Sequence, residues 1–499
     1  MKLRNAMFPV QIYKRRVNTM YGYDKKEFTE YAEKRRLVYA DERARDAVKN
    51  EGIGNGVTGH TGISWLFCLG STMAGLKTLE ADAEEKEILR ALARRVKELS
   101  ELPVQEERKK LWDDHLCLKE TRPVVFIDPE KAWYEIFPHT VLKCHNDLAR
   151  VWELRLLKEI WWQENIGDDR VCRDTFSVQD IVTFSDFGLP KKKTGGGGNG
   201  AYHIDASIED YDEDLPKLRF RELFHDTEKS ARLREIAEDT FGGILTVVRD
   251  NAWWYSAGLT VDAIELRGFE NFLYDIYDYP DELKALMAFL RDDWLHMLSE
   301  LEKHDLLSLN NGGEFMGTGG YGWCSDFPKG ADWGRNLAGG IKHVTPMDMW
   351  GYGESQESVS LSPDAFGEFV LPYQVPILEK FGLNSYGCCE PLDTRIDRII
   401  DKVPRLRKVV VSPWSDAAFM AEKLKGNYAY CWKQNPAYIA TPKINEDAIR
   451  KEIRDVFAVT AKHGCHVEIL DRDILTLAWK PENAARWVQI AMEEAKKYE

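Results

Sequence analysis

The sequence lacks any run of about 18 consecutive apolar residues, the length that a membrane-spanning helix requires. Its first segment, MKLRNAMFPVQIYKRR, also lacks the apolar centre of a secretory signal. The 9 cysteines are scattered along the chain, and their odd number argues against a disulfide framework. We therefore expect a cytoplasmic protein that is neither exported nor inserted into a membrane.

An excess of positive charge is missing as well. The 499 residues carry a formal net charge of −15 at pH 7, so the phosphates of a nucleic acid would be repelled. Hydrophobic residues make up 44% of the chain and charged residues 30%, which is typical of a globular protein with a sizeable core. This balance argues against nucleic-acid binding and against disorder, and a small-molecule partner is expected instead.

Phosphate-binding loops are absent from both glycine-rich stretches. The stretch EGIGNGVTGHTGISW lacks the lysine and hydroxyl residue that close such a loop, and in KKKTGGGGNG the lysines precede the glycines. No G-x-G-x-x-G follows any of the strands predicted below, which argues against a dinucleotide fold. We predict turn or lid glycines in the first stretch and a flexible inserted loop near residues 190–215 in the second.

The chain divides into a helical front and an alternating back. Charged segments with apolar residues at helical spacing, at 24–50 and 80–111, predict a helical N-terminal region over residues 1–120. From residue 121 to 499, short apolar runs alternate with amphipathic segments, which is typical of βα units. The runs lie at 124–127, 244–248, 306–309, 408–412 and 466–470, and the clearest helices at 280–303 and from Pro481. An α/β fold, specifically a (βα)8 TIM barrel, is predicted.

Thiols and a carboxylate meet in NSYGCCEPLD, residues 384–393, which we predict to end a buried strand. Alternation along a strand would place Tyr386, Cys388 and Glu390 on one face and Cys389 on the other, towards the surrounding helices. At the C-terminal end of a barrel strand, Cys388 and Glu390 would be metal ligands or a thiol beside an acid. Two buried, small apolar cysteines are the alternative.

Further polar residues lie at the ends of other predicted strands. Glu354, in DMWGYGES, is a candidate metal ligand or general acid, and His343 before that strand is a candidate proton carrier. Lys433 follows another strand and would neutralise a substrate carboxylate or phenolate. Each has a structural alternative, as an ion-paired or exposed residue.

The last predicted strand carries a second cluster. His466 and Glu468 share a face by the period of two, and Asp471 and Asp473 follow. Because the C-terminal ends of barrel strands meet at one face, these acids are expected to complete the site begun by Cys388.

Three spaced motifs together resemble the uroporphyrinogen decarboxylase superfamily over about residues 240–499. The first approximates a glycine and two aspartates before a barrel helix, the second is an S-P-x-x-F turn, and the third is a closing P-E-N. They comprise Gly268, Asp275, Asp278 and Pro280; Ser362, Pro363 and Phe366; and Pro481, Glu482 and Asn483.

The resemblance is nearest to the corrinoid-dependent methyltransferase branch, in which an H-x-C strand and a final cysteine bind zinc. Here Tyr386 stands in place of the histidine and Cys388 matches the cysteine. The last strand offers acids in place of the final cysteine. The resemblance therefore implies a zinc site with mixed sulfur and oxygen ligands, namely Cys388, Glu468, Asp471 and Asp473.

The activity so implied is transfer of a methyl group from a small substrate, such as an aromatic methoxy compound in anaerobic O-demethylation, to a corrinoid protein. No D-x-H-x-x-G occurs, so the corrinoid is expected on a separate partner. The catalytic candidates are Glu354, Glu390, His343 and Lys433, and a homodimer is compatible with the resemblance.

Two other functions remain open. One is a decarboxylase or lyase of the same fold, which would need basic residues at the mouth, with Arg35 and Arg36 the nearest match to the arginine-rich segment of that branch. The other is a non-enzymatic binding module that keeps the pocket without the chemistry.

Overall fold

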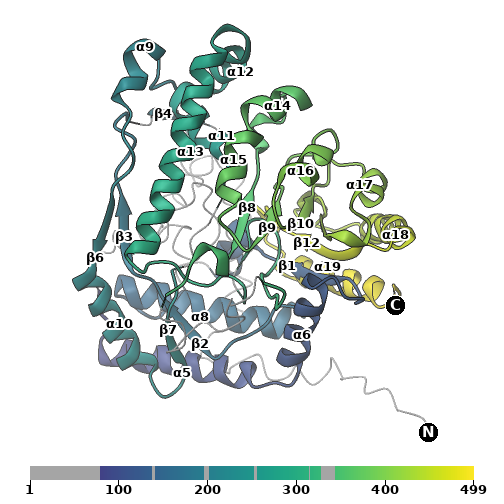
Figure 1. Cartoon of the computed structure of the whole chain (residues 1–499). Coiled ribbons are helices and arrows are strands. Elements are labelled where there is room, and N and C mark those ends of the chain that lie inside the picture. Colours follow the sequence, from purple (N-terminus) through teal and green to yellow (C-terminus); the bar gives the residue numbers. More distant parts are fainter. Residues whose placement is uncertain are drawn as a thin grey trace.

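The centre of the molecule is a parallel sheet of six strands in the order β1-β12-β11-β10-β9-β8 (Figure 1). A computed structural model describes residues 79–498 apart from 138–140, 191, 196–201, 252–255, 314 and 328–342. The strands span Val124–Ile127 (β1), Trp350–Gly353 (β8), Leu383–Tyr386 (β9), Leu406–Val411 (β10), Ala429–Lys433 (β11) and His466–Asp471 (β12). Buried aliphatic and aromatic residues dominate these strands, as both faces of a parallel sheet are covered.

Smaller sheets accompany the central one. Strands β2 (Thr175–Val178) and β7 (Thr246–Arg249) form a parallel pair, and two antiparallel pairs are β3–β6 and β4–β5. Their bounds are Ile181–Phe184 (β3), Lys192–Gly195 (β4), Tyr202–Asp205 (β5) and Leu223–Asp226 (β6). The predicted loop near 190–215 thus contains a β-hairpin in its described part. The architecture is α/β, and the hydrogen-bonded ladder of six strands ends at β1 and β8.

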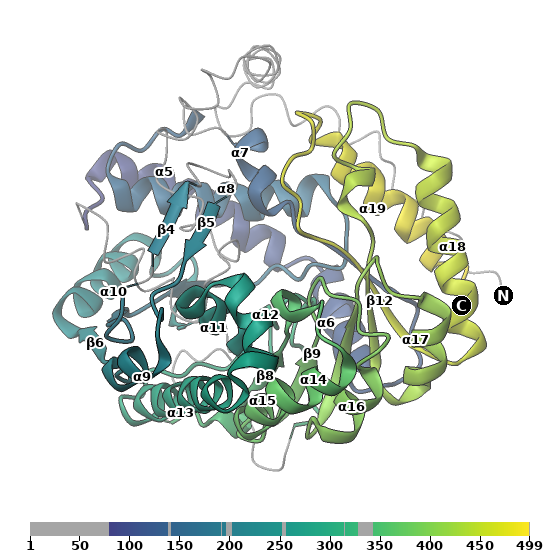
Figure 2. The same cartoon turned by 90° about the horizontal axis from the view of Figure 1, so that it is seen from above.

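Helices surround the sheet, and Figure 2 shows them at the periphery with β8, β9 and β12 nearer the middle. Contacts place α19 against β1, α17 against β11 and α15 against β8. The helices span Ala83–Ser100 (α5), Val104–Leu116 (α6), Trp133–Ile136 (α7), Asp147–Asn165 (α8), Tyr211–Asp214 (α9), Thr227–Phe241 (α10), Leu259–Arg267 (α11), Phe269–Asp278 (α12), Pro280–Lys303 (α13), Pro363–Phe369 (α14), Leu371–Leu378 (α15), Ile396–Lys402 (α16), Ala417–Leu424 (α17), Glu446–Lys462 (α18) and Glu482–Ala495 (α19).

Several elements match the sequence predictions. Helix α13 begins at Pro280 with Asp281 and Glu282 in its first turn, and its buried side includes Leu283, Leu286 and Leu290. The predicted strand at 124–127 is β1, and those at 408–412 and 466–470 correspond to β10 and β12 within two residues. The run at 306–309 is wrong as a strand, since it has no ladder partner among the described residues. The predicted helix at 24–50, the glycines at 52–56 and Arg35 and Arg36 lie outside the described residues.

Residues of the three spaced motifs have structural roles where helices and loops meet. Gly268 has φ +83 where α11 meets α12, a left-handed conformation that favours glycine. Asp275 forms an ion pair with Arg267 at 2.6 Å, and Ser362 caps α14 by accepting the Ala365 N–H. Asn483 donates to the Ile439 and Thr441 carbonyls. These residues therefore hold elements together at a distance from the strand ends.

No helix among the described residues is long and apolar enough to span a membrane.

Candidate active site at the strand ends

Glu354 follows β8 directly and is buried, with 3% of its surface exposed. Burial raises the pKa of Glu354 well above its ordinary value, and the neighbouring carboxyl groups of Glu357 and Glu390 add to the rise. Gly258 makes room for this side chain, because a Cβ at position 258 would lie 1.8 Å from Oε1 of Glu354. Its surroundings therefore favour the protonated form of Glu354.

The two oxygens of Glu354 have different hydrogen-bond partners. Oε2 accepts the N–H of Gln356 at 3.1 Å, and Oε1 accepts a longer bond, 3.5 Å, from the Ser256 hydroxyl. Because the backbone bond to Oε2 is the shorter one, we assign the acidic proton to Oε1. This oxygen is the one able to donate to a ligand.

Glu390, four residues after the end of β9, differs from Glu354 in its hydrogen bonds. Its Oε1 accepts the N–H of Ser355 and its Oε2 the N–H of Cys388, both at 3.0 Å. Burial raises the pKa of Glu390, but these two backbone donors oppose the rise. Both oxygens are committed as acceptors, so Glu390 suits a positioning role and Glu354 suits proton donation.

The two thiols of NSYGCCEPLD lie beside each other, with their Sγ atoms 3.5 Å apart. Strand β9 ends at Tyr386, and Gly387 has φ +107, so alternation does not extend to the cysteines. Cys388 is buried, while Cys389 is partly exposed and donates to Oδ2 of Asp473 at 3.3 Å. The predicted register is therefore wrong: Cys389 contacts the end of β12 and does not face the helices.

Lys433 and Asp473 continue the row of polar groups. Nζ of Lys433, at the end of β11, lies 3.1 Å from Oδ2 of Asp473 and 4.0 Å from Sγ of Cys389. Burial would lower the pKa of Lys433, but Asp473 and the two thiols raise it above the ordinary value. Lys433 is thus a buried, permanently charged cation at the edge of the site.

Arg472 and Glu130 belong to the same edge, although the sequence analysis did not single them out. The guanidinium of Arg472 contacts Oε1 of Glu130 at 2.9 Å and lies 4.0 Å from Oδ2 of Asp128. Glu130 has φ +44, an uncommon conformation for a residue other than glycine. In the sequence, Arg472 stands between two candidate site residues, Asp471 and Asp473. That position was the signal by which Arg472 could have been predicted as part of the site.

A short hairpin, residues 315–321, joins the two sides of the site. Its ends pair through a Phe315–Tyr321 bridge, and Arg472 donates to the carbonyls of Gly317 and Gly319 at 3.3 and 3.2 Å. Gly317 has φ +58, and a Cβ there would lie 2.3 Å from the ring of Tyr352 on β8. Glycine is therefore required for the hairpin to pass between β12 and β8.

Thr318, at the tip of this hairpin, contacts β8 and the residue that follows β9. Its Oγ1 lies 3.2 Å from the Tyr352 hydroxyl and donates to the Gly387 carbonyl at 3.2 Å. The hairpin is thus in contact with the residues that precede Glu354 and Cys388, as well as with Arg472. The sequence signal for it, the glycines of MGTGGYG, was not recognised.

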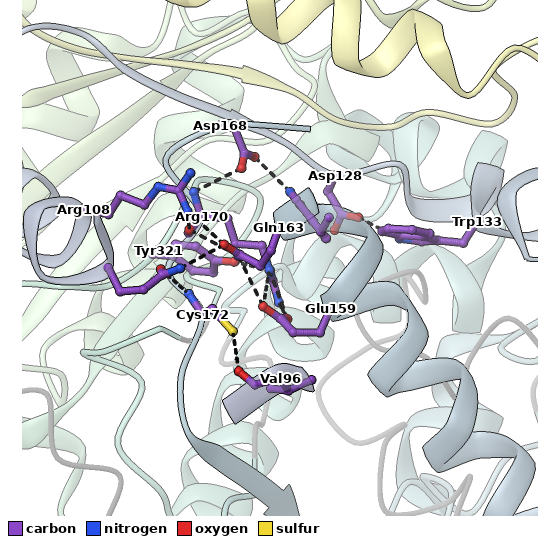
Figure 3. A network of polar contacts seen from close by, with 12 residues as sticks. Val96, Arg108, Asp128, Trp133, Glu159, Gln163, Asp168, Arg170, Cys172 and Tyr321 are labelled. Carbon is purple, nitrogen blue, oxygen red and sulfur yellow. Dashed lines mark hydrogen bonds and ion pairs between the residues drawn. The ribbon is translucent and has the colours of Figure 1, made fainter. Parts of the chain in front are cut away.

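A buried polar network fixes the other end of the hairpin (Figure 3). Arg170 forms an ion pair with Glu159 of α8, donates to the hydroxyl of Tyr321, and stacks over Trp162 at 4.1 Å. Asp168 accepts the N–H of Ile127 at 3.2 Å, so the same network is tied to β1. These contacts position the hairpin, and in the same figure Asp128 accepts a hydrogen bond from Nε1 of Trp133 at 3.4 Å.

Glu468 lies in the middle of β12 and not at its end. It is fully buried, and its oxygens contact Nζ of Lys408 at 2.7 Å and Nε2 of His115 at 3.0 Å. Burial would raise the pKa of Glu468, but Lys408 and His115 lower it to about 2. This triad joins β10, β12 and α6 and accounts for both carboxylate oxygens.

The remaining candidates are spread out. Asp471 is fully buried, and burial raises its pKa well above the ordinary value, with neither oxygen hydrogen-bonded to a described residue. His343 is exposed beside Glu302 and Asp305, each at 3.6 Å, before β8 begins. His466 opens β12, at the opposite end of the strand from Asp473. The structure thus brings together Glu354, Glu390, Cys388, Lys433 and Asp473, and places His343, His466 and Glu468 elsewhere.

The implied zinc site was tested on this geometry. A tetrahedral zinc site needs at least three protein donors around one point. Among the described residues, the group of three candidate donors within 4.8 Å of one another is Asp82, Glu85 and His145, none of which is a predicted ligand. Glu468 is engaged by Lys408 and His115, and Asp473 by Lys433, so the four predicted ligands do not form a zinc site. Zinc stays a prediction, and no chemical step below depends on it.

Lys158 on α8 is an unusual buried cation next to this region. It is 8% exposed, and its Nζ lies 5.1 Å from the ring centre of Trp133. Burial lowers the pKa of Lys158 to about 7, and Asp128 only partly opposes this. Between pH 7 and the ordinary value near 10.5, the unfolded chain therefore binds a proton that the folded chain does not.

Lys158→Met is expected to stabilise the protein by about 2 kcal/mol at pH 7, because a desolvated ammonium is removed. Stability of the natural protein rises with pH between about 7 and 10.5, so the advantage of the variant should shrink over that range. Urea unfolding at pH 7 and pH 10 measures both effects. Lys451→Met, at an exposed ion pair on α18, is the control and should change little. If Lys158→Met instead destabilises the protein at pH 7, burial of the Lys158 ammonium group does not cost stability, and this prediction is wrong.

Comparisons with known proteins give little further information. The sequence matches no protein family and no curated protein. Among solved structures it is similar to a methyltransferase from Methanosarcina mazei, with a TM-score of 0.39 and 11% sequence identity. That match covers 78% of this chain and 98% of the other. At this TM-score the likeness establishes neither a shared fold nor a shared activity.

Proposed function

We propose that the protein is a methyltransferase that takes a methyl group from a small methylated substrate, such as an aromatic methoxy compound. The observation that supports this activity best is the buried Glu354 at the end of β8, whose raised pKa favours the protonated form and whose Oε1 is free of backbone donors. The proposed acceptor, reduced cobalt in a corrinoid carried by a separate protein, rests on the resemblance to the uroporphyrinogen decarboxylase superfamily. The same resemblance supports a closed (βα)8 barrel in which β2 and β7 complete the ring begun by the six-stranded sheet.

Breaking the bond between a methyl group and an oxygen leaves an alkoxide or phenolate, which is a poor leaving group. The electron pair of that bond stays on the oxygen, and the proton on Oε1 of Glu354 neutralises it. A reduced corrinoid, when bound with its carrier protein, would supply the electron pair of the new bond to the methyl carbon. Glu354 is left as a carboxylate and regains its proton from solvent before the next turnover.

Neighbouring residues raise the pKa of Glu354 and fix its position. Glu390 and Glu357 raise the pKa of Glu354, so the proton is retained until the leaving group needs it. Glu390 also accepts the N–H of Ser355, the residue next to Glu354, and thereby fixes the chain after β8. On the other side, Lys433 would contact an anionic group of the substrate while sharing its charge with Asp473, 3.1 Å away.

The test is a reaction mixture of the purified protein, a panel of methoxylated aromatic acids and a corrinoid protein reduced to the cobalt(I) state. We expect the demethylated product, detected by chromatography, together with loss of the cobalt(I) absorption. Omitting either protein should abolish both signals. Full demethylation without any corrinoid would contradict the proposed acceptor.

A decarboxylase is the second candidate, favoured by the buried cations Lys433 and Arg472 at the same strand ends. Such residues would hold a substrate carboxylate and stabilise the charge left when carbon dioxide departs. Both cations are already paired, with Asp473 and Glu130 respectively, which leaves less charge for a substrate. Release of carbon dioxide from a carboxylated substrate, with no methyl transfer, would favour this candidate.

A further inference from the structure

A second pair of neighbouring thiols lies outside the candidate site. Cys117 caps the C-terminal end of α6, and Cys324 follows the hairpin by three residues. Their Sγ atoms are 3.7 Å apart although the residues are separated by 207 positions in the sequence. Folding therefore brings two distant thiols into contact.

The two thiols differ in access. Cys324 is fully buried, and its thiol also approaches the Leu116 carbonyl at 3.6 Å. Cys117 is partly exposed, and its Sγ lies 3.5 Å from Oγ of the exposed Ser325. Of the other described cysteines, Cys389 is also partly exposed, and the rest are buried, namely Cys144, Cys172, Cys388, Cys431 and Cys465. Cys117 is thus reached from solvent, with Cys324 directly behind it.

Their acidities differ in the same sense. The hydrogen bond from Cys324 lowers the pKa of Cys117 to about 7, against the effects of burial and of Asp113. That same interaction and burial raise the pKa of Cys324. At neutral pH, Cys117 is partly a thiolate, which is the nucleophilic form, and Cys324 stays a thiol.

We propose that Cys117 is an oxidation site for small hydroperoxides and that Cys324 resolves the product into a Cys117–Cys324 disulfide. The Cys117 thiolate attacks one peroxide oxygen, the O–O bond breaks, and the departing hydroxide takes a proton to become water. Cys324 then attacks the sulfenic sulfur, and its thiol proton leaves with the hydroxyl as a second water. Two thiols are oxidised by two electrons and one hydrogen peroxide is reduced to two waters.

The disulfide would connect α6 to the chain that leaves the hairpin. Trp112 of α6 lies against Gly320 and Tyr321, with its ring centre 5.6 Å from that of Tyr321. Oxidation would therefore join α6 covalently to the chain that follows the hairpin, at the end opposite to Thr318 at the hairpin tip. This inference is independent of the proposed function, because it concerns thiols that no catalytic step uses.

Peptide mapping tests the proposal on the full chain. The protein is exposed to stoichiometric hydrogen peroxide at pH 7, free thiols are blocked by alkylation, and the digest is analysed by mass spectrometry. We expect the crosslinked Cys117–Cys324 peptide in the natural protein and in a Cys465→Ser control. In Cys324→Ser, Cys117 should be trapped as sulfenic acid by dimedone, and in Cys117→Ser, Cys324 should remain reduced.

Alkylation rates provide a readout that does not need the crosslink. Iodoacetamide should modify Cys117 at least about tenfold faster than Cys465, with a half-maximal rate near pH 7. Equal rates for Cys117 and Cys465 would overturn the proposal. So would a peroxide-treated protein in which Cys388 and Cys389 form a disulfide while Cys117 and Cys324 stay reduced.

Discussion

Glu354→Gln is expected to lower kcat for methyl transfer by about 10²–10⁴-fold while the protein stays folded. Glutamine keeps the shape and the bond from the Gln356 N–H, but its amide has no acidic proton to give to the leaving oxygen. Steady-state kinetics with the corrinoid partner measure kcat and KM separately. A fall in kcat with little change in KM indicates a group that acts in the transition state.

The pH profile distinguishes an acid from a merely structural residue. Because Glu354 must be protonated, the rate of the natural enzyme should fall as pH rises through its raised pKa. Glu354→Gln should lack that fall. Glu368→Gln, at an exposed ion pair with Lys284, is the matched control and should retain full activity. A kcat for Glu354→Gln within about threefold of the natural enzyme would refute the role of this acid, since general acids contribute far more.

Glu468→Gln is expected to reduce the free energy of unfolding by about 3–5 kcal/mol at pH 7, because it leaves Lys408 buried without a carboxylate. The stabilisation from Glu468 is fully present above its ordinary pKa of 4.5 and is lost as pH falls towards about 2. Denaturant unfolding between pH 7 and pH 3 measures both the size and the pH dependence. The loss between natural protein and variant should shrink at the acidic end.

A double substitution measures the contribution of the Lys408–Glu468 ion pair separately from that of either residue alone. If the cost comes from an uncompensated ammonium, Lys408→Met combined with Glu468→Gln should recover most of the stability that Glu468→Gln loses. Glu368→Gln should change the stability by less than about 0.5 kcal/mol, as exposed ion pairs contribute little. Unchanged stability in Glu468→Gln together with loss of a bound metal would instead support the ligand role that the resemblance implies.

The α/β architecture was predictable because short-range patterns determine it. Apolar runs correctly predicted β1, β10 and β12, and a proline followed by two acidic residues correctly predicted the start of α13. The run at 306–309 was misassigned because a buried apolar segment has the same composition whether or not it joins a ladder. Closure of the sheet depends on such pairings, which the pattern of one segment does not contain.

The site was predictable at individual strand ends but not as a set. Strand position located Glu354, Lys433 and Asp473 correctly at one end of the sheet, since parallel strands finish together. Period-two alternation failed for Cys388 and Cys389 because the left-handed Gly387 ends the strand first. Glu468 was assigned to the site because its partners, Lys408 and His115, are 60 and 353 residues away and cannot be inferred from local sequence.

The hairpin at 315–321 also determines when the site can form during folding. Its contacts with Arg472 span 153 and 155 residues, and Arg472 directly follows β12, the last strand of the described chain. Loop closure over such separations is slow and follows local helix formation. A chain that still lacks β12 also lacks α19, and its hairpin is without the contacts from Arg472. The strand ends of the candidate site are therefore expected to assemble late, when β12 docks.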